Sequence, residues 1–243
     1  EFYMSGHSKW ANIKHKKAKQ DQERGRIFTR LTKEITMAAR HGGGDPDTNF
    51  RLRLVIDEAR DNNMPNDTID RAIKRGIGAL GGANLEEVTY EGYGPSGVAV
   101  MANALTDNRN RTAGEVRWIF SKYGGNLGTD GCVAWMFERQ GLIIAENPNG
   151  LSEDDILMVA LDSGALDVRF DEDSVEIITT IEDLQPIEEE LVKANLKVVH
   201  AEVALIPQNT IDLSDEDLEK LETLLNALDD NDDVQNVWHN ADL

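Results

Sequence analysis

Apolar residues in the first third of the chain recur at the spacing of an α-helix. They follow one another every three or four positions between Ile27 and Ala39, between Leu52 and Ala59, and between Ile69 and Ile73. The first run stops at the glycines of positions 42–44, and the third stops before Gly76. The pattern therefore predicts three helices that pack into a small bundle.

Beyond residue 82 the pattern changes to short β-branched runs that alternate with helical periods. We expect strands at 87–93, 98–105, 132–137, 142–146, 167–171, 174–180, 197–206 and 234–239. We expect helices at 112–123, 153–163, 182–194 and 215–228, the second of them capped by Ser152. Alternation of this kind is typical of sheets covered by helices.

These elements predict an α+β protein in which an N-terminal helical bundle is followed by two α/β domains. The central one has the order βαββαβ of a ferredoxin-like unit, and we expect it to be inserted in the other. The expected domains are 1–82, basic and helical; 83–140 with 208–243, a discontinuous α/β domain; and 141–207, the inserted ferredoxin-like α/β domain.

Charge separates the start of the chain from the rest. The stretch Lys9–Lys33 contains nine lysines and arginines and only two acidic residues, Asp21 and Glu23. Its net charge is about +7, in a chain whose total is −20. The remainder carries about −27. Such segregation predicts a head that binds a polyanion, although a solvated basic helix would look the same. We expect a helix at Trp10–Gln20, whose lysines are spread around its axis. We therefore expect this helix to become ordered when it binds a polyanion.

A second basic stretch, at 108–111, alternates amide side chains with guanidiniums at the start of a helix. It suits contacts to phosphates and bases, but equally a capping turn whose arginines pair with nearby acids. Trp10 could stack on a base or anchor its own helix. The predicted nucleic-acid-binding residues are Lys9, Trp10, Lys14, His15, Lys16, Lys17, Lys19, Arg24, Arg26, Arg30, Lys33, Asn108, Arg109, Asn110 and Arg111.

The sequence contains no motif that is typical of an enzyme active site. The five histidines form no i, i+4 pair, and the single cysteine, Cys132, is expected to be a small buried residue of a strand. The acidic runs 171–173 and 229–233 lack the glycine and the glutamate of a calcium loop and are expected to be solvated turns. We therefore predict a protein that is not an enzyme and has no cofactor, metal site or small-molecule substrate.

Two further features concern where the protein works. No apolar run approaches the roughly 18 residues that a membrane span needs, so we expect no membrane partner. The single cysteine fits a reducing cytoplasm. Residues 1–3 precede Met4 and look like an expression remnant.

Five stretches together resemble the YebC family of probable transcriptional regulatory proteins, which includes the mitochondrial translational activator of cytochrome c oxidase. They are GHSKWANIKHKKAKQD (6–21), GGGDPDTNFRLR (42–53), YEGYGPSG (90–97), TDNRNRT (106–112) and GGNLGTDGCVAWMF (124–137).

The resemblance implies three domains and a cytoplasmic, non-enzymatic regulator of gene expression. Its partner is DNA in one description of the family. In the other the protein acts on the ribosome, binds ribosomal RNA and relieves stalling. The sequence leaves both open, and it leaves the oligomeric state open as well.

Overall fold

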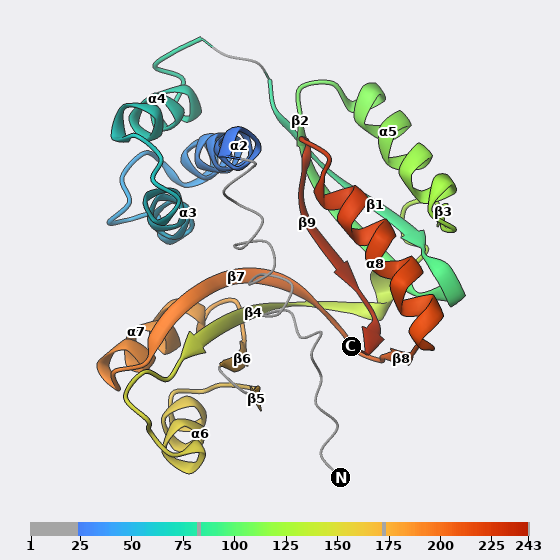
Figure 1. The fold of residues 1–243 in the computed structure, drawn as a ribbon. Helices are drawn as coiled ribbons and strands as arrows, with labels where there is room; N and C mark the ends of the chain where they lie inside the picture. Colours follow the sequence, from blue (N-terminus) through green and yellow to red (C-terminus); the bar gives the residue numbers. More distant parts are fainter. Residues whose placement is uncertain (1–23, 82–83, 172–173, 243) are drawn as a thin grey trace. The chain divides into compact units, whose positions relative to one another are not determined.

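The computed structural model describes residues 24–81, 84–171 and 174–242, which fall into two compact units. The larger unit consists of described residues 24–136 and 209–242, and the smaller of 137–208 (Figure 1). Each unit contains a four-stranded antiparallel sheet together with α-helices. The predicted α+β class is confirmed.

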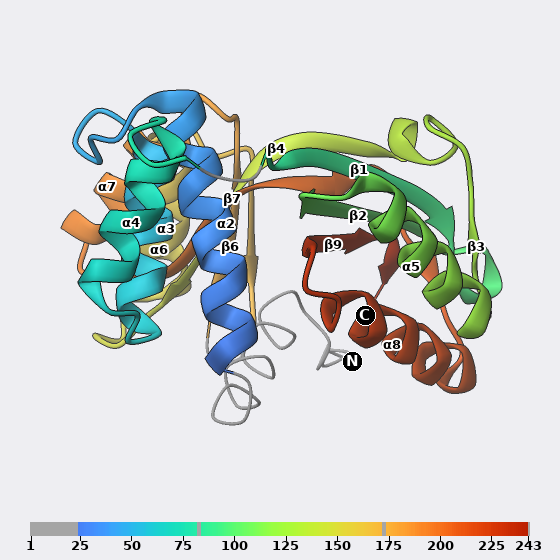
Figure 2. The ribbon, with the colours of Figure 1, turned by 90° about the horizontal axis from the view of Figure 1, so that it is seen from above.

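The larger unit begins with the helices that the periodicity predicts: α2 (Arg24–Gly42), α3 (Phe50–Asp61) and α4 (Asn66–Gly76). The three helices lie side by side (Figure 2). Their apolar faces meet in one core that includes Leu31, Ile35, Leu52, Ile56 and Ile69. Buried Asn49 joins two of these helices, because its side chain accepts from the backbone N–H of Leu52 and donates to the carbonyl of Ala38. This capping contact fixes where α3 begins.

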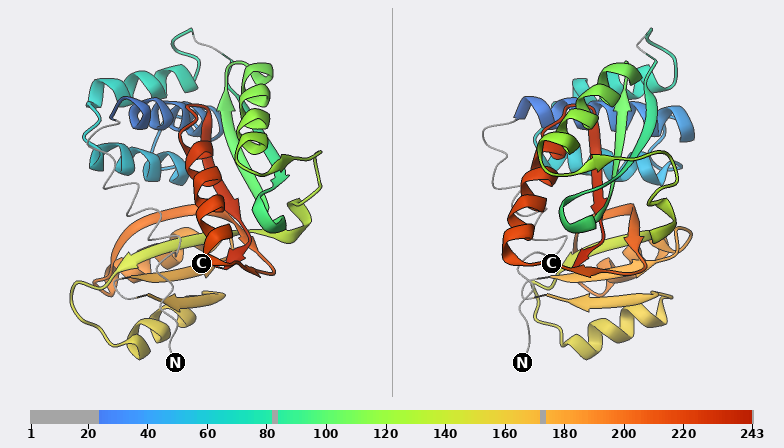
Figure 3. Two further views of the ribbon diagram at one scale, coloured as in Figure 1. Left: turned by 45° about the vertical axis from the view of Figure 1, so that its right-hand side comes forward. Right: turned by 90° about the vertical axis from the view of Figure 1, so that its right-hand side faces the viewer.

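The sheet of the larger unit has the order β3-β1-β2-β9. Its strands are β1 (Glu86–Tyr93), β2 (Ala99–Thr106), β3 (Asn126–Leu127) and β9 (Val234–His239). Helices α5 (Arg109–Lys122) and α8 (Asp215–Asp229) pack side by side on this sheet (Figure 3). A short parallel pair, β8 (Ile211–Asp212) with β10 (Ala241–Asp242), and the 3-10 turn η2 (Pro95–Gly97) complete the unit.

The chain order in the smaller unit is β4, α6, β5, β6, α7, β7, and its sheet has the order β5-β6-β4-β7. The elements are β4 (Phe137–Glu146), α6 (Glu153–Asp162), β5 (Asp167–Phe170), β6 (Val175–Thr179), α7 (Leu184–Lys193) and β7 (Lys197–Pro207). Ser152 caps α6 by accepting from the backbone N–H of Asp155, as the sequence predicts.

The strand predicted at 132–137 is wrong. A turn and the 3-10 helix η3 (Ala134–Met136) occupy this stretch, and β4 begins only at Phe137. The physical reason is Glu91, a buried carboxylate on β1 that accepts hydrogen bonds from the backbone N–H groups of Gly131, Val133 and Ala134 at 2.7–3.0 Å. The backbone folds around this acceptor, and half-buried Cys132 lies in a turn and not in a strand.

Candidate nucleic-acid interface

The structure describes part of the predicted binding set. Lys9, Trp10, Lys14, His15, Lys16, Lys17 and Lys19 lie outside the described residues, as does the side chain of Arg24. The others form two groups. Arg26, Arg30 and Lys33 lie on α2, and 108–111 lies at the start of α5.

Asp233, just before β9, joins the two groups. Lys33 donates to Oδ1 of this carboxylate over 2.6 Å, and Arg111 donates to Oδ2 over 2.7 Å. The hydroxyl of Thr112 also donates to Oδ2, over 2.7 Å. The Asp233 side chain is only 5% exposed, so these donors replace the water that burial removed.

The electrostatics of Asp233 follow from these contacts. Burial alone would raise its pKa, but the hydrogen bonds from Arg111, Lys33 and Thr112 outweigh burial and lower the pKa from 3.8 to about 2. Asp233 is therefore ionised at neutral pH, and its negative charge offsets the two cations that contact it. The expectation that 229–233 is a solvated turn is wrong at this residue.

Two other cations of α2 contact residues 230–235. Arg26 pairs with Asp230 at 3.3 Å and with Asp232 at 3.7 Å, while Arg30 donates to the carbonyl of Gln235 over 2.9 Å. The Arg26 pairs are about half exposed, so each contributes little to stability and can open to admit another anion.

The stretch 108–111 combines a cap with exposed side chains. Asn108 caps α5 by accepting from the backbone N–H of Arg111 over 3.1 Å, and Arg111 also pairs with Asp107 at 3.0 Å. The capping-turn interpretation accounts for these two residues. Arg109 and Asn110 are exposed, and within the described residues Arg109 makes no ion pair and the Asn110 side chain makes no hydrogen bond. These two stay candidates for contact with a ligand.

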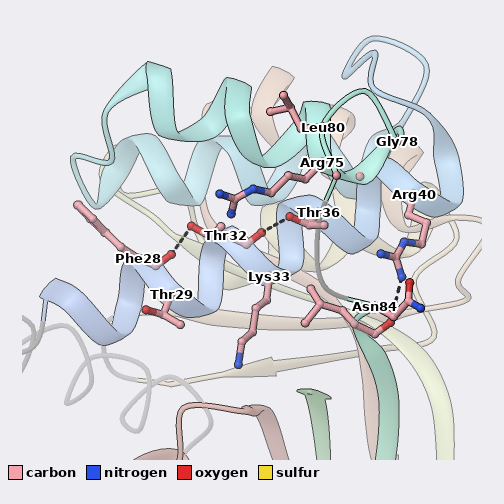
Figure 4. Close-up of a pocket in the computed structure, with 13 residues that line it drawn as sticks. Phe28, Thr29, Thr32, Lys33, Thr36, Arg40, Arg75, Gly78, Leu80 and Asn84 are labelled. Atoms are coloured by element: carbon pink, nitrogen blue, oxygen red, sulfur yellow. Dashed lines mark hydrogen bonds between the residues drawn. The ribbon is translucent and has the colours of Figure 1, made fainter. Parts of the chain in front are cut away.

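A hollow of about 780 Å³ lies along α2, beside the end of α4 and the start of β1 (Figure 4). Lys33, Arg40 and Arg75 belong to its described lining, in which no acidic residue occurs. Arg40 donates to the carbonyl of Leu85 over 3.0 Å, and Lys33 is held by Asp233. Arg75 is exposed and, among the described residues, forms no ion pair. The hollow thus presents guanidinium donors to an anion.

Threonines form the α2 side of this hollow. The hydroxyls of Thr29, Thr32 and Thr36 donate to carbonyls one turn earlier in their own helix, at 2.9, 2.6 and 2.7 Å. Their lone pairs remain available to accept hydrogen bonds. Sequence reasoning missed Arg40 and Arg75. The signal for Arg40 was present, because Thr29, Lys33, Thr36 and Arg40 recur with helical spacing on one face.

Other chemistry has little support in the described structure. No group of three or more histidine, cysteine or acidic residues within 24–81, 84–171 and 174–242 could hold a metal ion. Burial, followed by the negative charge of Glu91, raises the pKa of the Cys132 thiol, which disfavours the reactive thiolate. Over the same ranges every helix is too short or too polar to cross a lipid bilayer.

Comparison with known proteins assigns the chain to a family. The model of the TACO1/YebC protein N-terminal domain matches residues 8–79, and that of the TACO1/YebC second and third domain matches residues 85–241. The chain belongs to the TACO1/YebC family. The resemblance inferred from the five sequence stretches is therefore confirmed.

Relatives and a solved structure match along nearly the whole chain. A probable transcriptional regulatory protein of Thermoanaerobacter pseudethanolicus is 58% identical and covers 99% of this chain and 98% of its own. One of Caldanaerobacter subterraneus is 56% identical, with 99% of both chains covered. The crystal structure of a conserved hypothetical protein from Aquifex aeolicus superposes with a TM-score of 0.88, at 47% identity over 97% of both chains.

Proposed function

We propose that this protein is a non-enzymatic, cytoplasmic regulator of gene expression that binds nucleic acid through its basic N-terminal segment. The observation that carries the proposal is the segregation of charge, about +7 within Lys9–Lys33 against about −27 elsewhere. TACO1/YebC relatives that match the whole chain are named probable transcriptional regulatory proteins, which supports this role.

The described contacts distinguish cations that stabilise the fold from cations that are free to bind phosphate. Lys33 and Arg111 are committed to buried Asp233, so they contribute to the fold and add little free positive charge. We infer that phosphates contact the N-terminal lysines first and the exposed guanidinium of Arg75 next. Binding of this kind releases counterions and weakens steeply as salt rises.

We also propose the finer domain arrangement: a helical domain up to residue 82, a discontinuous α/β domain at 83–140 with 208–243, and an inserted ferredoxin-like domain at 141–207. The chain order β4-α6-β5-β6-α7-β7 and the sheet order β5-β6-β4-β7 support the last of these.

The test replaces Lys14, Lys16, Lys17 and Lys19 together with glutamine. A matched variant replaces Lys74, Lys193, Lys197 and Lys220, which are exposed and lie outside the basic segment, so that both proteins lose the same charge. We expect the first variant to lose nucleic-acid binding with little change in melting temperature, and the second to bind like the parent. Equal losses in both would attribute binding to net charge alone, and a large drop in melting temperature would make the segment structural.

Ultraviolet crosslinking in cells, followed by sequencing of the attached DNA and RNA, identifies the target. Crosslinks at a few promoters would establish a DNA-binding regulator. Crosslinks concentrated in ribosomal RNA would establish a factor that acts on the ribosome. The −27 remainder favours this second candidate, because its repulsion would keep the protein from coating nucleic acid indiscriminately. Absence of both kinds of crosslink would contradict the proposal.

A further inference from the structure

Helix α5 is basic in an acidic part of the chain. It carries Arg109, Arg111, Arg117 and Lys122 against one acid, Glu115, whose carboxylate accepts from the Asn231 amide over 2.8 Å. Arg111 is held by Asp233, but Arg109 and Arg117 are exposed and form no ion pair among the described residues. The exposed surface of α5 therefore carries more positive than negative side chains.

An aromatic side chain lies among these charges. Trp118 is 58% exposed, although the neighbouring positions Val116, Ile119 and Phe120 are buried against the rest of the unit. The ammonium of Lys122 lies 4.5 Å from the centre of a Trp118 ring and 4.8 Å from that of Tyr123. This cation–π contact restrains the indole on one side and leaves much of its surface open.

Gly114 lies one helical turn before Trp118, and packing does not explain it. A Cβ atom built at this position meets nothing within 4 Å, so the fold has room for alanine. Glycine in a helix interior lowers helix stability without a compensating contact here. With Asn110 one turn earlier, Gly114 and Trp118 lie on the same side of α5. The glycine thus exposes bare backbone beside the indole.

We propose that this outward face of α5 binds a single-stranded stretch of nucleic acid. An unpaired base stacks on Trp118, while Arg117 and Lys122 contact the flanking phosphates. Gly114 lets the base and its sugar approach the helix backbone. Stacking on aromatic side chains combined with cationic contacts is the general mode of single-strand binding. In a duplex the faces of the bases are covered by their neighbours, so the face selects unpaired strands.

The inference rests on the proposed function but depends on different residues. The N-terminal lysines supply long-range attraction for any polyanion, whereas Trp118 requires an exposed base. A variant of α5 should therefore change the preference for single strands over duplex, and the four-lysine variant should weaken binding to both.

The experiment measures fluorescence anisotropy of three labelled probes: a 12-nucleotide uridine strand, a 12-nucleotide thymidine strand and a 12-base-pair DNA duplex. Trp118→Ala is compared with Trp135→Ala, which removes another tryptophan, 67% exposed and outside α5. We expect Trp118→Ala to bind the single strands about fivefold or more weakly and the duplex unchanged, with Trp135→Ala within about twofold of the parent. The two single strands distinguish RNA from DNA as the favoured source.

A second variant protects the test against misfolding. Gly114→Ala keeps the helix and should still weaken single-strand binding, because its methyl group covers the helix backbone that the base and its sugar would approach. Parental affinity for single strands in both α5 variants would overturn the inference while leaving the proposed function intact. Failure of the parent protein to bind any of the three probes would also overturn the inference, and the crosslinking experiment would then decide the proposed function separately.

Discussion

Substitution of Asp233 by asparagine removes the charge on which two distant parts of the larger unit converge. The carboxylate has its pKa lowered from 3.8 to about 2, and its side chain is 5% exposed. That shift corresponds to about 2 kcal/mol of folding free energy at neutral pH. The asparagine side chain keeps the volume but leaves Lys33 and Arg111 without their buried partner. We therefore expect Asp233→Asn to lower the free energy of unfolding by at least about 2 kcal/mol.

The pH dependence gives a second, independent readout. Because the pKa of Asp233 is lower in the folded state, its contribution is present above about pH 4 and is lost as pH falls toward 2. Stability of the variant should therefore fall less steeply than that of the parent between these values. Urea unfolding followed by tryptophan fluorescence is suitable, since Trp118, Trp135 and Trp238 all belong to the larger unit.

Asp107→Asn is the matched control. Asp107 contacts the same Arg111 guanidinium at 3.0 Å, but its side chain is 51% exposed, so its loss should cost less than about 1 kcal/mol. Two results would refute the role of Asp233 as the buried partner of Lys33 and Arg111. One is that Asp233→Asn is no more destabilising than Asp107→Asn, and the other is that the stability of both variants falls with pH as steeply as that of the parent.

Two further substitutions test the packing. Glu91→Gln should destabilise the larger unit at neutral pH and make its stability less dependent on pH in acid. Burial raises the pKa of this carboxyl, but hydrogen bonds from three backbone N–H groups outweigh burial and lower it, so its contribution to stability is lost as pH falls. Urea titrations at pH 7 and pH 4 measure this, and an equal stability difference between parent and variant at the two pH values would contradict it. Gly76→Ala should destabilise the protein by more than about 1 kcal/mol, because its Cβ would meet the Thr36 carbonyl and the Ala39 side chain. Gly114→Ala should stabilise it by up to about 1 kcal/mol. Thermal melts in which Gly114→Ala were the less stable of the two would contradict both predictions.

The sequence predicted those elements whose burial has a regular period. Helices α2 to α4 and the cap at Ser152 depend on neighbours within a few residues, which local patterns record. The stretch 132–137 was mistaken for a strand because its backbone partner, Glu91, lies some forty positions earlier. The role of Asp233 was missed for the same reason, since Lys33 is 200 residues away. Contacts of that range leave no period in the sequence.

The segment around Glu91 has a consequence for how this protein would look in solution. Backbone amides that donate to a buried carboxylate exchange slowly with deuterated solvent, just as strand amides do. Gly131, Val133 and Ala134 would therefore exchange slowly although they belong to no sheet. An exchange map would therefore show protection like that of an additional strand next to β1. Acidification protonates the Glu91 carboxylate, so it should reduce the protection of these amides while those of β1 and β2 stay protected.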